Sequence, residues 1–497
     1  MSTLDYLAAL LALAGLLYYW SISTFSFWKD RGVPGPKPLP LIGNFKDVLT
    51  DRISIGPWLL SFYTGYQNEP MVGIFIRRQP VLVLRDLDLI RDIFIRDFSK
   101  FPDRGIQVFE KADPLFQHLF NLDHSKWRPL RNKLSPAFTS GKLKDMFYLL
   151  LNRGDHLQEY VDKLIAKSDS IEVRDLTARF TTDVIGSCAF GLEMHAMDDE
   201  NSEFRKMGKY VFDFDWKRVL KFRIREGAPW LYHLLWPIMR DNYLTDFFMN
   251  TMKATIEHRR KTKIVRHDFI DQIIEIQDHP ERIPEVKLTD TLLTSQLFVF
   301  FLAGFETSST TISNALYELA QHQDCQDRLR EEIREVMKRE GKLTYDVVQN
   351  MKYLNMVFQE TLRKYPPVMV LVRQSDAPYT FSNTSVSIPA NTLIMISAMG
   401  IHRDPEIYED PEKFDPERFT EEAFKSRHPM SYLAFGDGPR NCIGERFAKQ
   451  QTKIGLIKIL ESFRVDVNDK TEIPYKVNPR GFLLAPLNGI YLKFTKI

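Results

Sequence analysis

The sequence of 497 residues contains only three cysteines, Cys188, Cys325 and Cys442, and they stand far apart. An odd number of distant cysteines supports neither a disulfide framework nor a zinc cluster, and it is typical of a chain that faces a reducing, cytosolic environment. An excess of one charge is also missing, because 67 lysines and arginines oppose 65 acidic residues. With no basic run that interleaves aromatic residues, nothing in the sequence indicates a nucleic-acid partner.

One stretch lacks charge altogether, from Tyr6 to Trp28. An apolar run of this length is about enough for one helix to cross a bilayer. Its aromatic end suits the membrane interface: Tyr18, Tyr19, Trp20 and Trp28. Basic residues follow the run, which predicts that the body of the protein stays in the cytoplasm. A cleaved signal peptide is the alternative, but its basic beginning is missing, so we predict a retained anchor over residues 1–28.

Prolines cluster directly after this run, in Val33-Pro34-Gly35-Pro36-Lys37-Pro38-Leu39-Pro40. Clustered prolines stiffen the backbone without demanding hydrogen bonds, so we expect residues 29–43 to be a hinge that sets the body at a fixed angle to the anchor. Apolar runs bounded by turn signals predict short strands between Pro70 and Leu84. The remainder is mainly helical, which predicts an α+β fold that is mainly α with small β-sheets.

Cys442 lies in a stretch that combines flexible backbone, one cation and one aromatic ring. A thiolate that ligates iron needs donors aimed at its sulfur and no bulk in the way of a flat macrocycle, and nearby glycines such as Gly438 and Gly444 supply both. Arg440 can clamp a carboxylate bidentately, and Phe435 can shield the sulfur from water. The alternative is a lone buried cysteine that acts as a small hydrophobic side chain.

Taken together, Phe435-Gly436-Asp437-Gly438-Pro439-Arg440-Asn441-Cys442-Ile443-Gly444 resembles the haem-binding signature of the cytochrome P-450 superfamily, Phe-x-x-Gly-x-Arg-x-Cys-x-Gly, at every specified position. The resemblance implies a haem-thiolate monooxygenase with haem b as cofactor and Cys442 as the metal ligand. It also implies the cytochrome P-450 fold, with a single large haem domain over residues 44–497. Further motif detail, including Ser135-Pro136-Ala137-Phe138-Thr139-Ser140-Gly141-Lys142, looks most like the insect microsomal family-six group of xenobiotic-metabolising enzymes.

Trp127 and Arg131 are four residues apart, so they share one helix face and can bind a carboxylate together. The alternative is an aromatic core residue beside a solvated arginine. In the family this pair holds a haem propionate, and Arg373 matches another position that reaches a propionate. A further family arginine has only a loose match, at Asp103-Arg104-Gly105.

Glu360 and Arg363 are three residues apart, a spacing that by itself most often means a weak surface ion pair. With Arg418 in Pro416-Glu417-Arg418-Phe419 they resemble the Glu-x-x-Arg and Pro-Glu-Arg-Phe motifs of the superfamily. The resemblance implies that Glu360, Arg363 and Arg418 form a buried, structural charge network. Removal of one partner should leave uncompensated charge and abolish haem loading.

The longest predicted helix begins near Thr289 or Asp290 and ends at about His322. Gly304 interrupts its apolar run at a cost of about 1 kcal/mol, and the gap it leaves can admit dioxygen and a local kink. Glu306 and Thr307 form an acid and alcohol pair that can relay protons to bound oxygen. A capped, solvent-facing polar patch is the alternative. The family carries the same pattern over the distal haem face.

Apolar residues from three segments are predicted to line the substrate pocket: Phe109, Phe116, Phe120, Val299, Ala303, Val368, Met369 and Leu371. Val299, Ala303 and Thr307 should face substrate from one side of the long helix. A packed core would show the same residue types. Residues 209–248 mix aromatic and basic residues, which fits either a membrane-surface segment or ordinary packed helices. The family resemblance adds that this region often dips into the bilayer and gates the access of substrates.

Gly436-x-Gly438 is not a dinucleotide site, because the third glycine of that motif would fall on Asn441. The resemblance therefore implies that electrons come from NADPH–cytochrome P-450 reductase, and it allows cytochrome b5 as a second donor. Basic residues behind Cys442 can attract an acidic partner, although solvated surface charge is the competing explanation: Lys126, Arg128, Lys133, Arg446 and Lys449.

The predicted reaction inserts one atom of O2 into a lipophilic substrate, such as a xenobiotic, plant toxin, insecticide or endogenous lipid, at the endoplasmic reticulum membrane. One rival is a haem-thiolate isomerase or dehydratase that needs no reductase, and the presence of Glu306 and Thr307 argues against it. The other is a non-enzymatic haem-binding sensor or ligand carrier.

Overall fold

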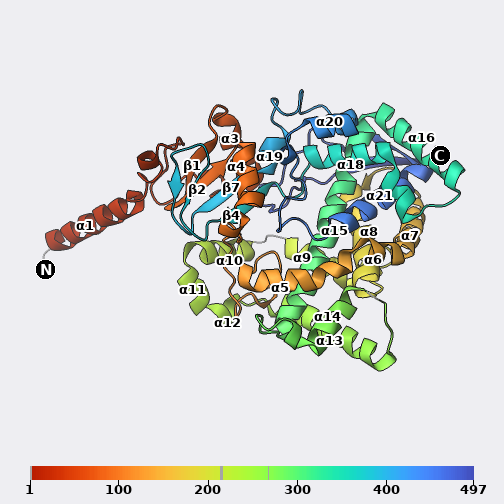
Figure 1. Ribbon diagram of the computed structural model, residues 1–497, viewed down its shortest axis with the longest axis horizontal. Coiled ribbons are helices and arrows are strands. Elements are labelled where there is room, and N and C mark those ends of the chain that lie inside the picture. The colour runs from red at the N-terminus through yellow and green to blue at the C-terminus, as the bar shows by residue number, and fades with distance from the viewer. Residues whose placement is uncertain (1–2, 213–215, 267) are drawn as a thin grey trace.

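The computed structural model describes residues 3–212, 216–266 and 268–497, and its first helix projects from the body (Figure 1). This helix, α1, spans Thr3–Ile22, and Ser21 is the buried residue within it. It is long and apolar enough to cross a membrane. The helix leaves the body beside the N-terminal sheet, whereas the C-terminus lies at the opposite end of the molecule.

The junction between α1 and the body is a docked segment. Trp28 is 3% exposed, and its indole Nε1 donates a hydrogen bond to the Ile74 carbonyl at 3.0 Å. A Cβ at Gly73 would lie 2.3 Å from the Trp28 ring, so this glycine leaves the room that the indole fills. The prediction that Trp28 lies at the membrane interface is therefore wrong. The backbone N–H of Gly73 also donates to Pro34 at 2.8 Å, which fastens the proline-rich segment to the same strand.

The predicted strands between Pro70 and Leu84 are confirmed. They form an antiparallel hairpin in a four-stranded sheet of order β1-β2-β7-β4, in which β2 and β7 are parallel and β4 and β7 antiparallel. These strands are β1 Met71–Ile76, β2 Gln79–Leu84, β7 Leu393–Ser397 and β4 Val370–Gln374. A second sheet has the order β3-β9-β8, and β5 pairs with β6. Their bounds are β3 Ile171–Glu172, β9 Tyr491–Lys496, β8 Phe463–Val467, β5 Tyr379–Thr380 and β6 Ser387–Ile388.

Helices make up most of the described chain, which confirms the predicted fold class. In chain order after α1 they are α2 Lys46–Leu49, α3 Ile55–Gly65, α4 Leu87–Arg91, α5 His124–Leu134, α6 Ser140–Asp145, α7 Phe147–Ile165, α8 Val173–Ile185, α9 Glu203–Phe212, α10 Trp216–Gly227, α11 Pro229–Leu234, α12 Trp236–Met239, α13 Asn242–Thr262, α14 Phe269–Asp278, α15 Asp290–Gln321, α16 Gln323–Glu340, α17 Tyr345–Asn350, α18 Lys352–Lys364, α19 Ala398–His402, α20 Glu421–Ser426 and α21 Glu445–Ser462.

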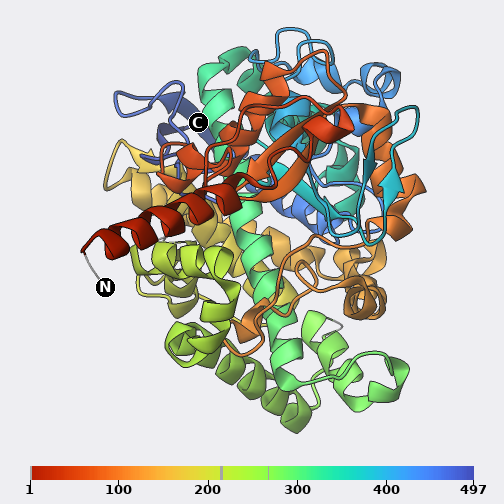
Figure 2. The same ribbon diagram turned by 90° about the vertical axis from the view of Figure 1, so that its left-hand side faces the viewer.

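Helix α15 runs through the middle of the body (Figure 2) and agrees with the predicted long helix. The Thr289 hydroxyl caps its first turn by accepting a hydrogen bond from the Leu292 N–H at 3.1 Å. A Cβ at Gly304 would lie 2.7 Å from Ile185 of α8, so this glycine allows two helices to approach closely. The predicted gap at Gly304 therefore faces a packed neighbour and is filled, which is a correction to the expected opening for dioxygen.

Candidate functional site

Cys442 lies in the loop that leads into α21, two residues before Gly444, the residue that caps this helix. The loop is closed by a hydrogen bond from the Cys442 N–H to the Phe435 carbonyl at 2.9 Å. The Cys442 side chain has exposed surface, yet burial among protein atoms raises the pKa of its thiol. Exposed surface and surrounding protein atoms occur together when a side chain faces an unfilled space between segments of the protein. The backbone N–H of Gly444 and the nearby Arg131 lower this pKa and so favour the thiolate.

Gly438 and Gly444 of this loop have different surroundings. A Cβ at Gly438, where φ is +72°, would lie 1.9 Å from the Phe94 carbonyl oxygen, so Gly438 is needed for contact with a neighbouring segment. This differs from its predicted role of leaving space for a macrocycle. A Cβ at Gly444 would meet no atom within 4 Å, which agrees with that role. The Phe435 ring stacks on Phe358 of α18, with 6.3 Å between the ring centroids.

Trp127 and Arg131 of α5 contact Arg440 and Asn441 of the cysteine loop. The Arg440 guanidinium stands over the buried Trp127 ring, 4.2 Å from its centroid. The same guanidinium donates to Asp103 and to the Leu122 carbonyl, each at 2.9 Å. Arg131 donates to the carbonyl and the side-chain oxygen of Asn441, each at 3.0 Å.

Arg104 joins this group although the sequence offered only a loose match for it. It donates to the Phe120 carbonyl at 2.8 Å and to the Arg440 carbonyl at 3.1 Å. Burial, together with the charges of Arg373, Arg440 and Arg131, holds the pKa of Arg104 well below its usual value. The signal in the sequence was an arginine next to an acidic residue, a pattern too common to identify a buried site.

The four arginines fit a ligand that carries carboxylates next to a thiolate. Burial and the charge of Arg440 lower the pKa of Arg373 to about 9, and burial lowers that of Arg440 to about 10. Among the described residues, no partner binds Arg440 Nε and Nη1 or Arg373 Nε, although these atoms are buried. Unpaired buried guanidinium groups are costly, so anions are expected here. The two propionates of a haem supply such charges.

The open side of α15 carries Val299, Ala303 and Thr307, which are all more exposed than the buried residues around them. This agrees with their predicted position on one face. The Thr307 hydroxyl donates to the Ala303 carbonyl at 2.7 Å. Glu306 is buried and forms an ion pair with Arg174 of α8, so it is not part of a solvent-facing polar patch. The acid and the alcohol thus contact different partners, and the sequence did not predict Arg174.

The predicted pocket residues have different surroundings. Phe116 lies 6.2 Å from Phe298 of α15, centroid to centroid, and Phe109 lies 4.9 Å from Tyr232 of α11. Phe120 lies under the Arg104 guanidinium at 4.2 Å.

The predicted pocket residues from the segment that follows α18 also differ in their surroundings. Val368 and Leu371 are half-buried, as expected of a wall residue. The prediction that Met369 lines the pocket is corrected, because its side chain is buried against α3. A Cβ at Gly56 would lie 2.3 Å from its sulfur.

The predicted charge network is present. The Arg363 guanidinium donates two hydrogen bonds to Glu360, at 2.6 and 2.8 Å, and both side chains are 0% exposed. Arg418 lies 3.6 Å from the same carboxylate, which also accepts from the Asp415 N–H at 2.8 Å. Burial raises the pKa of Glu360, and Arg363 opposes this shift.

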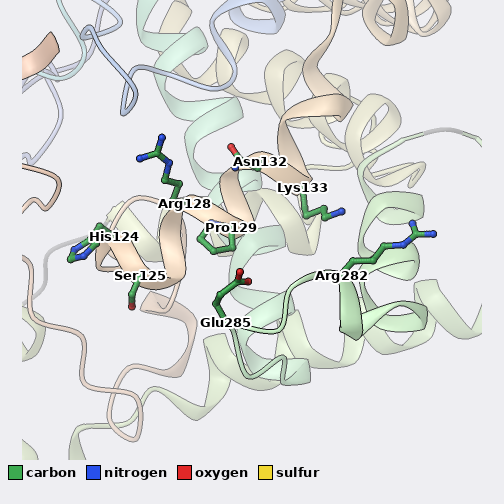
Figure 3. Close-up of a pocket in the computed structure, with 8 residues that line it drawn as sticks. All are labelled: His124, Ser125, Arg128, Pro129, Asn132, Lys133, Arg282 and Glu285. Atoms are coloured by element: carbon green, nitrogen blue, oxygen red, sulfur yellow. The ribbon is translucent and has the colours of Figure 1, made fainter. Parts of the chain in front are cut away.

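An open surface groove of about 410 Å³ lies beside α5, and Cys442 is not among the residues that line it (Figure 3). It is lined by His124, Ser125, Arg128, Pro129, Asn132, Lys133, Arg282 and Glu285. Of the basic residues predicted to meet a partner, Arg128 and Lys133 therefore line the groove, and Arg446 is exposed. Lys126 and Lys449 instead form ion pairs with Glu110 at 3.3 Å and Glu445 at 2.6 Å.

Comparison with known proteins gives one consistent result. The sequence model of the family described as Cytochrome P450 matches residues 33–493. The chain is 42% identical to "Probable cytochrome P450 6a14" of Drosophila melanogaster, over 97% of this chain and 98% of the relative. It is 41% identical to "Cytochrome P450 6A1" of Musca domestica, over 99% and 98%. It is 38% identical to "Cytochrome P450 6B1" of Papilio polyxenes, over 99% of each chain. The predicted resemblance to insect family-six members is thereby confirmed.

Proposed function

Because the chain belongs to the cytochrome P450 family and is a haem monooxygenase, we propose that Cys442 is the axial thiolate ligand of its haem. The observation that carries this proposal is a Cys442 side chain that has exposed surface although protein atoms surround it, under the charges of Arg131 and Arg104 and in a site whose buried arginines have guanidinium atoms without partners. When bound, the haem supplies dioxygen activation, with electron donation from sulfur that favours cleavage of the O–O bond.

The test is the carbon-monoxide difference spectrum of Cys442→Ala in the full chain. We expect the red-shifted Soret band to disappear, because this band depends on thiolate ligation. Cys325→Ser is the matched control, since Cys325 is a half-buried cysteine in α16, and it should keep the band. A normal band in Cys442→Ala would remove Cys442 as the ligand.

Five residues would hold the haem propionates: Trp127 and Arg131 of α5, Arg373 of β4, and Arg104 and Arg440 from loops. Their converging, partly unpaired donors support this role. Bidentate guanidinium contacts would fix the orientation of the macrocycle, and Gly444 would leave room beside it. Glu360, Arg363 and Arg418 would act at a distance, by joining α18 to the loop that leads toward Cys442.

Glu306 and Thr307 are proposed to deliver protons at the distal side. The Thr307 hydroxyl lies on the open side of α15, where it can donate a proton and be reprotonated, and the carboxyl group of Glu306, the preceding residue, lies in the same turn beside Arg174. We expect Thr307→Ala to keep haem content while more NADPH-derived electrons end in hydrogen peroxide. Thr311→Ala is the control, because its hydroxyl makes the same bond one turn further along, to the Thr307 carbonyl at 2.8 Å. Equal peroxide yields in the two variants would refute the relay.

Electrons are proposed to come from NADPH–cytochrome P-450 reductase, with cytochrome b5 as a second donor. The basic groove beside α5 supports an acidic partner, because Arg128 and Lys133 line it together with Arg282 (Figure 3). We expect Arg128→Glu to slow reductase-dependent reduction and to leave the ligand-binding spectrum unchanged. Lys163→Glu, an equal charge reversal on the exposed side of α7, should leave reduction unchanged. Equal effects of both would assign the loss to net charge.

Substrates are proposed to be lipophilic, such as plant toxins, insecticides or endogenous lipids, because apolar side chains flank the open face of α15. Consumption of NADPH with an oxygenated product would exclude both a reductase-independent isomerase and a sensor. We further propose that α1 anchors the protein in the endoplasmic reticulum membrane with the domain on the cytoplasmic side. Of the predicted anchor 1–28, only α1 would enter the membrane, since Trp28 is docked on β1, and the hinge 29–43 and the catalytic domain 44–497 follow. Exposed apolar residues on the side from which α1 projects support contact with a bilayer: Trp216, Leu220, Phe222, Trp230, Leu234 and Ile238.

A further inference from the structure

The cover segment, residues 216–239 with helices α10, α11 and α12, is attached to the body by unusual means. Helix α10 has twelve residues, and none of these twelve described residues is buried. A helix without a buried face gains little from apolar contact, so other interactions must hold it. Figure 1 shows the segment beside the four-stranded sheet, next to the loop that precedes α5.

Arg218 of α10 lies 3.9 Å from Asp241, and exposed hydrogen bonds attach α10 to three other segments. Arg225 donates to the Gln107 carbonyl at 3.0 Å, and Arg223 donates to the Leu49 carbonyl at 2.7 Å. From the β1–β2 turn, Arg77 donates to the Glu226 carbonyl at 2.5 Å. These three bonds involve exposed groups, where water competes as donor and acceptor, so each contributes little net stability.

Asp113, by contrast, binds the cover segment through a buried carboxylate. Its side chain is 7% exposed, and it binds the cover segment twice. One carboxylate oxygen accepts from Lys221 Nζ of α10 at 2.9 Å, and the other accepts from the Tyr232 hydroxyl of α11 at 2.7 Å. Tyr232 is 0% exposed and covers Ala112 and Phe109 in a small apolar cluster. Hydrogen bonds to a buried charged group are the strong ones, so this carboxylate dominates the attachment.

The segment under this carboxylate leads to the open face of α15. Phe109 and Phe116 belong to the same loop as Asp113, and Phe116 lies against Phe298 of α15. The Arg225 guanidinium lies 5.5 Å from the centroid of Phe116 and 5.8 Å from that of Phe109. The cover segment, the loop and α15 are thus stacked in that order, with aromatic side chains between them.

We propose that Asp113 is a latch whose bonds to Lys221 and Tyr232 keep the cover segment closed, and that their release opens a path for neutral lipophilic molecules past Phe109 and Phe116. The proposal rests on the proposed function, because it takes the open face of α15 as the destination of substrate. One carboxylate holds two helices, so loss of either bond weakens the attachment of both. The latch is a positioning device and touches neither substrate nor haem.

The first experiment measures movement of the cover segment with a readout that does not depend on the haem. Ala112→Cys, in a full chain that also carries Cys325→Ser, puts a thiol beneath Tyr232, where Ala112 is 1% exposed. Its alkylation by iodoacetamide, followed on the peptide that carries it so that Cys188 and Cys442 are not counted, requires the cover segment to move. Lys221→Met and Tyr232→Phe should each speed this alkylation about tenfold, as expected for loss of a hydrogen bond to a buried carboxylate.

Lys217→Met is the matched control, because it removes the same charge from the exposed side of α10, where Lys217 lies near Trp216. It should leave the alkylation rate unchanged. Equal rates in the control and in both latch variants would overturn the proposal. If Tyr232→Phe fails to fold, the alkylation rate of Lys221→Met still tests the proposal. Lys221 is 26% exposed, and its replacement removes no apolar contact from the cluster around Tyr232.

The second experiment follows phenylimidazole binding to the haem-loaded full chain by stopped-flow absorbance. A latch should raise the association and dissociation rates of the variants together, about tenfold each, and leave Kd within about threefold. A purely structural effect would change haem content or Kd instead, and that result would overturn the latch. Failure of the parent chain to show any spectral shift would count against the proposed function, whereas the alkylation rates would still judge the latch.

Discussion

The cysteine side of the molecule and the cover segment are held together in opposite ways. Around α18, Glu360 and Arg363 are 0% exposed, and their charges are satisfied by each other and by nearby backbone. In the cover segment, Trp230 is 70% exposed and Ile238 is 79% exposed, while polar bonds provide the attachment. Buried charge networks fail as a unit when one partner is lost, whereas the cover segment depends on the single buried carboxylate of Asp113 and on exposed polar bonds that can break and reform singly. The contrast suits a fixed cofactor cradle beside a movable cover.

The largest effect is expected from Arg363→Met. This change removes the two short hydrogen bonds to the buried Glu360 and leaves it with Arg418 at 3.6 Å and the Asp415 N–H, which should destabilise the folded protein by about 3–5 kcal/mol and abolish haem loading. Haem content and chemical unfolding of the full chain are the measurements. Lys425→Met is the control, because it breaks an ion pair with Glu421 whose side chains are 71% and 74% exposed, and no change is expected. Normal haem content in Arg363→Met would show that the buried charge network around α18 is not needed for haem loading.

An intermediate effect separates two glycines of the cysteine loop. Gly436 and Gly438 have similar φ values of +67° and +72°, so alanine should cost each about 1 kcal/mol of backbone strain. In Gly438→Ala the new Cβ would also meet the Phe94 carbonyl at 1.9 Å, whereas Gly436→Ala meets nothing within 4 Å. Thermal unfolding followed at the Soret band should therefore show a clearly larger loss for Gly438→Ala. Equal losses would mean that contact with Phe94 is unimportant.

The smallest effect on stability is expected in the cover segment. Trp230→Ser removes an exposed side chain, so the melting temperature should stay within the error of measurement. Contact with a bilayer should weaken, because one apolar anchor is lost. Binding to phospholipid vesicles, followed by co-sedimentation, measures this contact, because tryptophan fluorescence would change through the loss of Trp230 itself. A lowered melting temperature would show that the cover segment is more firmly integrated than its exposure indicates.

Local motifs were predictable because their chemistry depends on spacing within one turn or loop. Glu360 and Arg363 are three residues apart on one helix, and the sequence correctly predicts their pairing. The contacts of Arg104 and Arg174 were not predictable, since their partners stand far away in the chain. Met369 and Trp28 were misplaced for a related reason: each fills a space left by a glycine in another segment, Gly56 and Gly73 respectively.

By itself, the sequence determined the apolar N-terminal helix, the cysteine loop, the long central helix and the family, because each depends on residues that are close together in the chain. Only the tertiary structure decided that Gly304 serves close contact with Ile185, that Arg104 completes a group of four arginines, and that Asp113 binds two helices. The physical reason is that burial and charge neutralisation are properties of a place in space. Segments that are distant along the chain meet there only after folding.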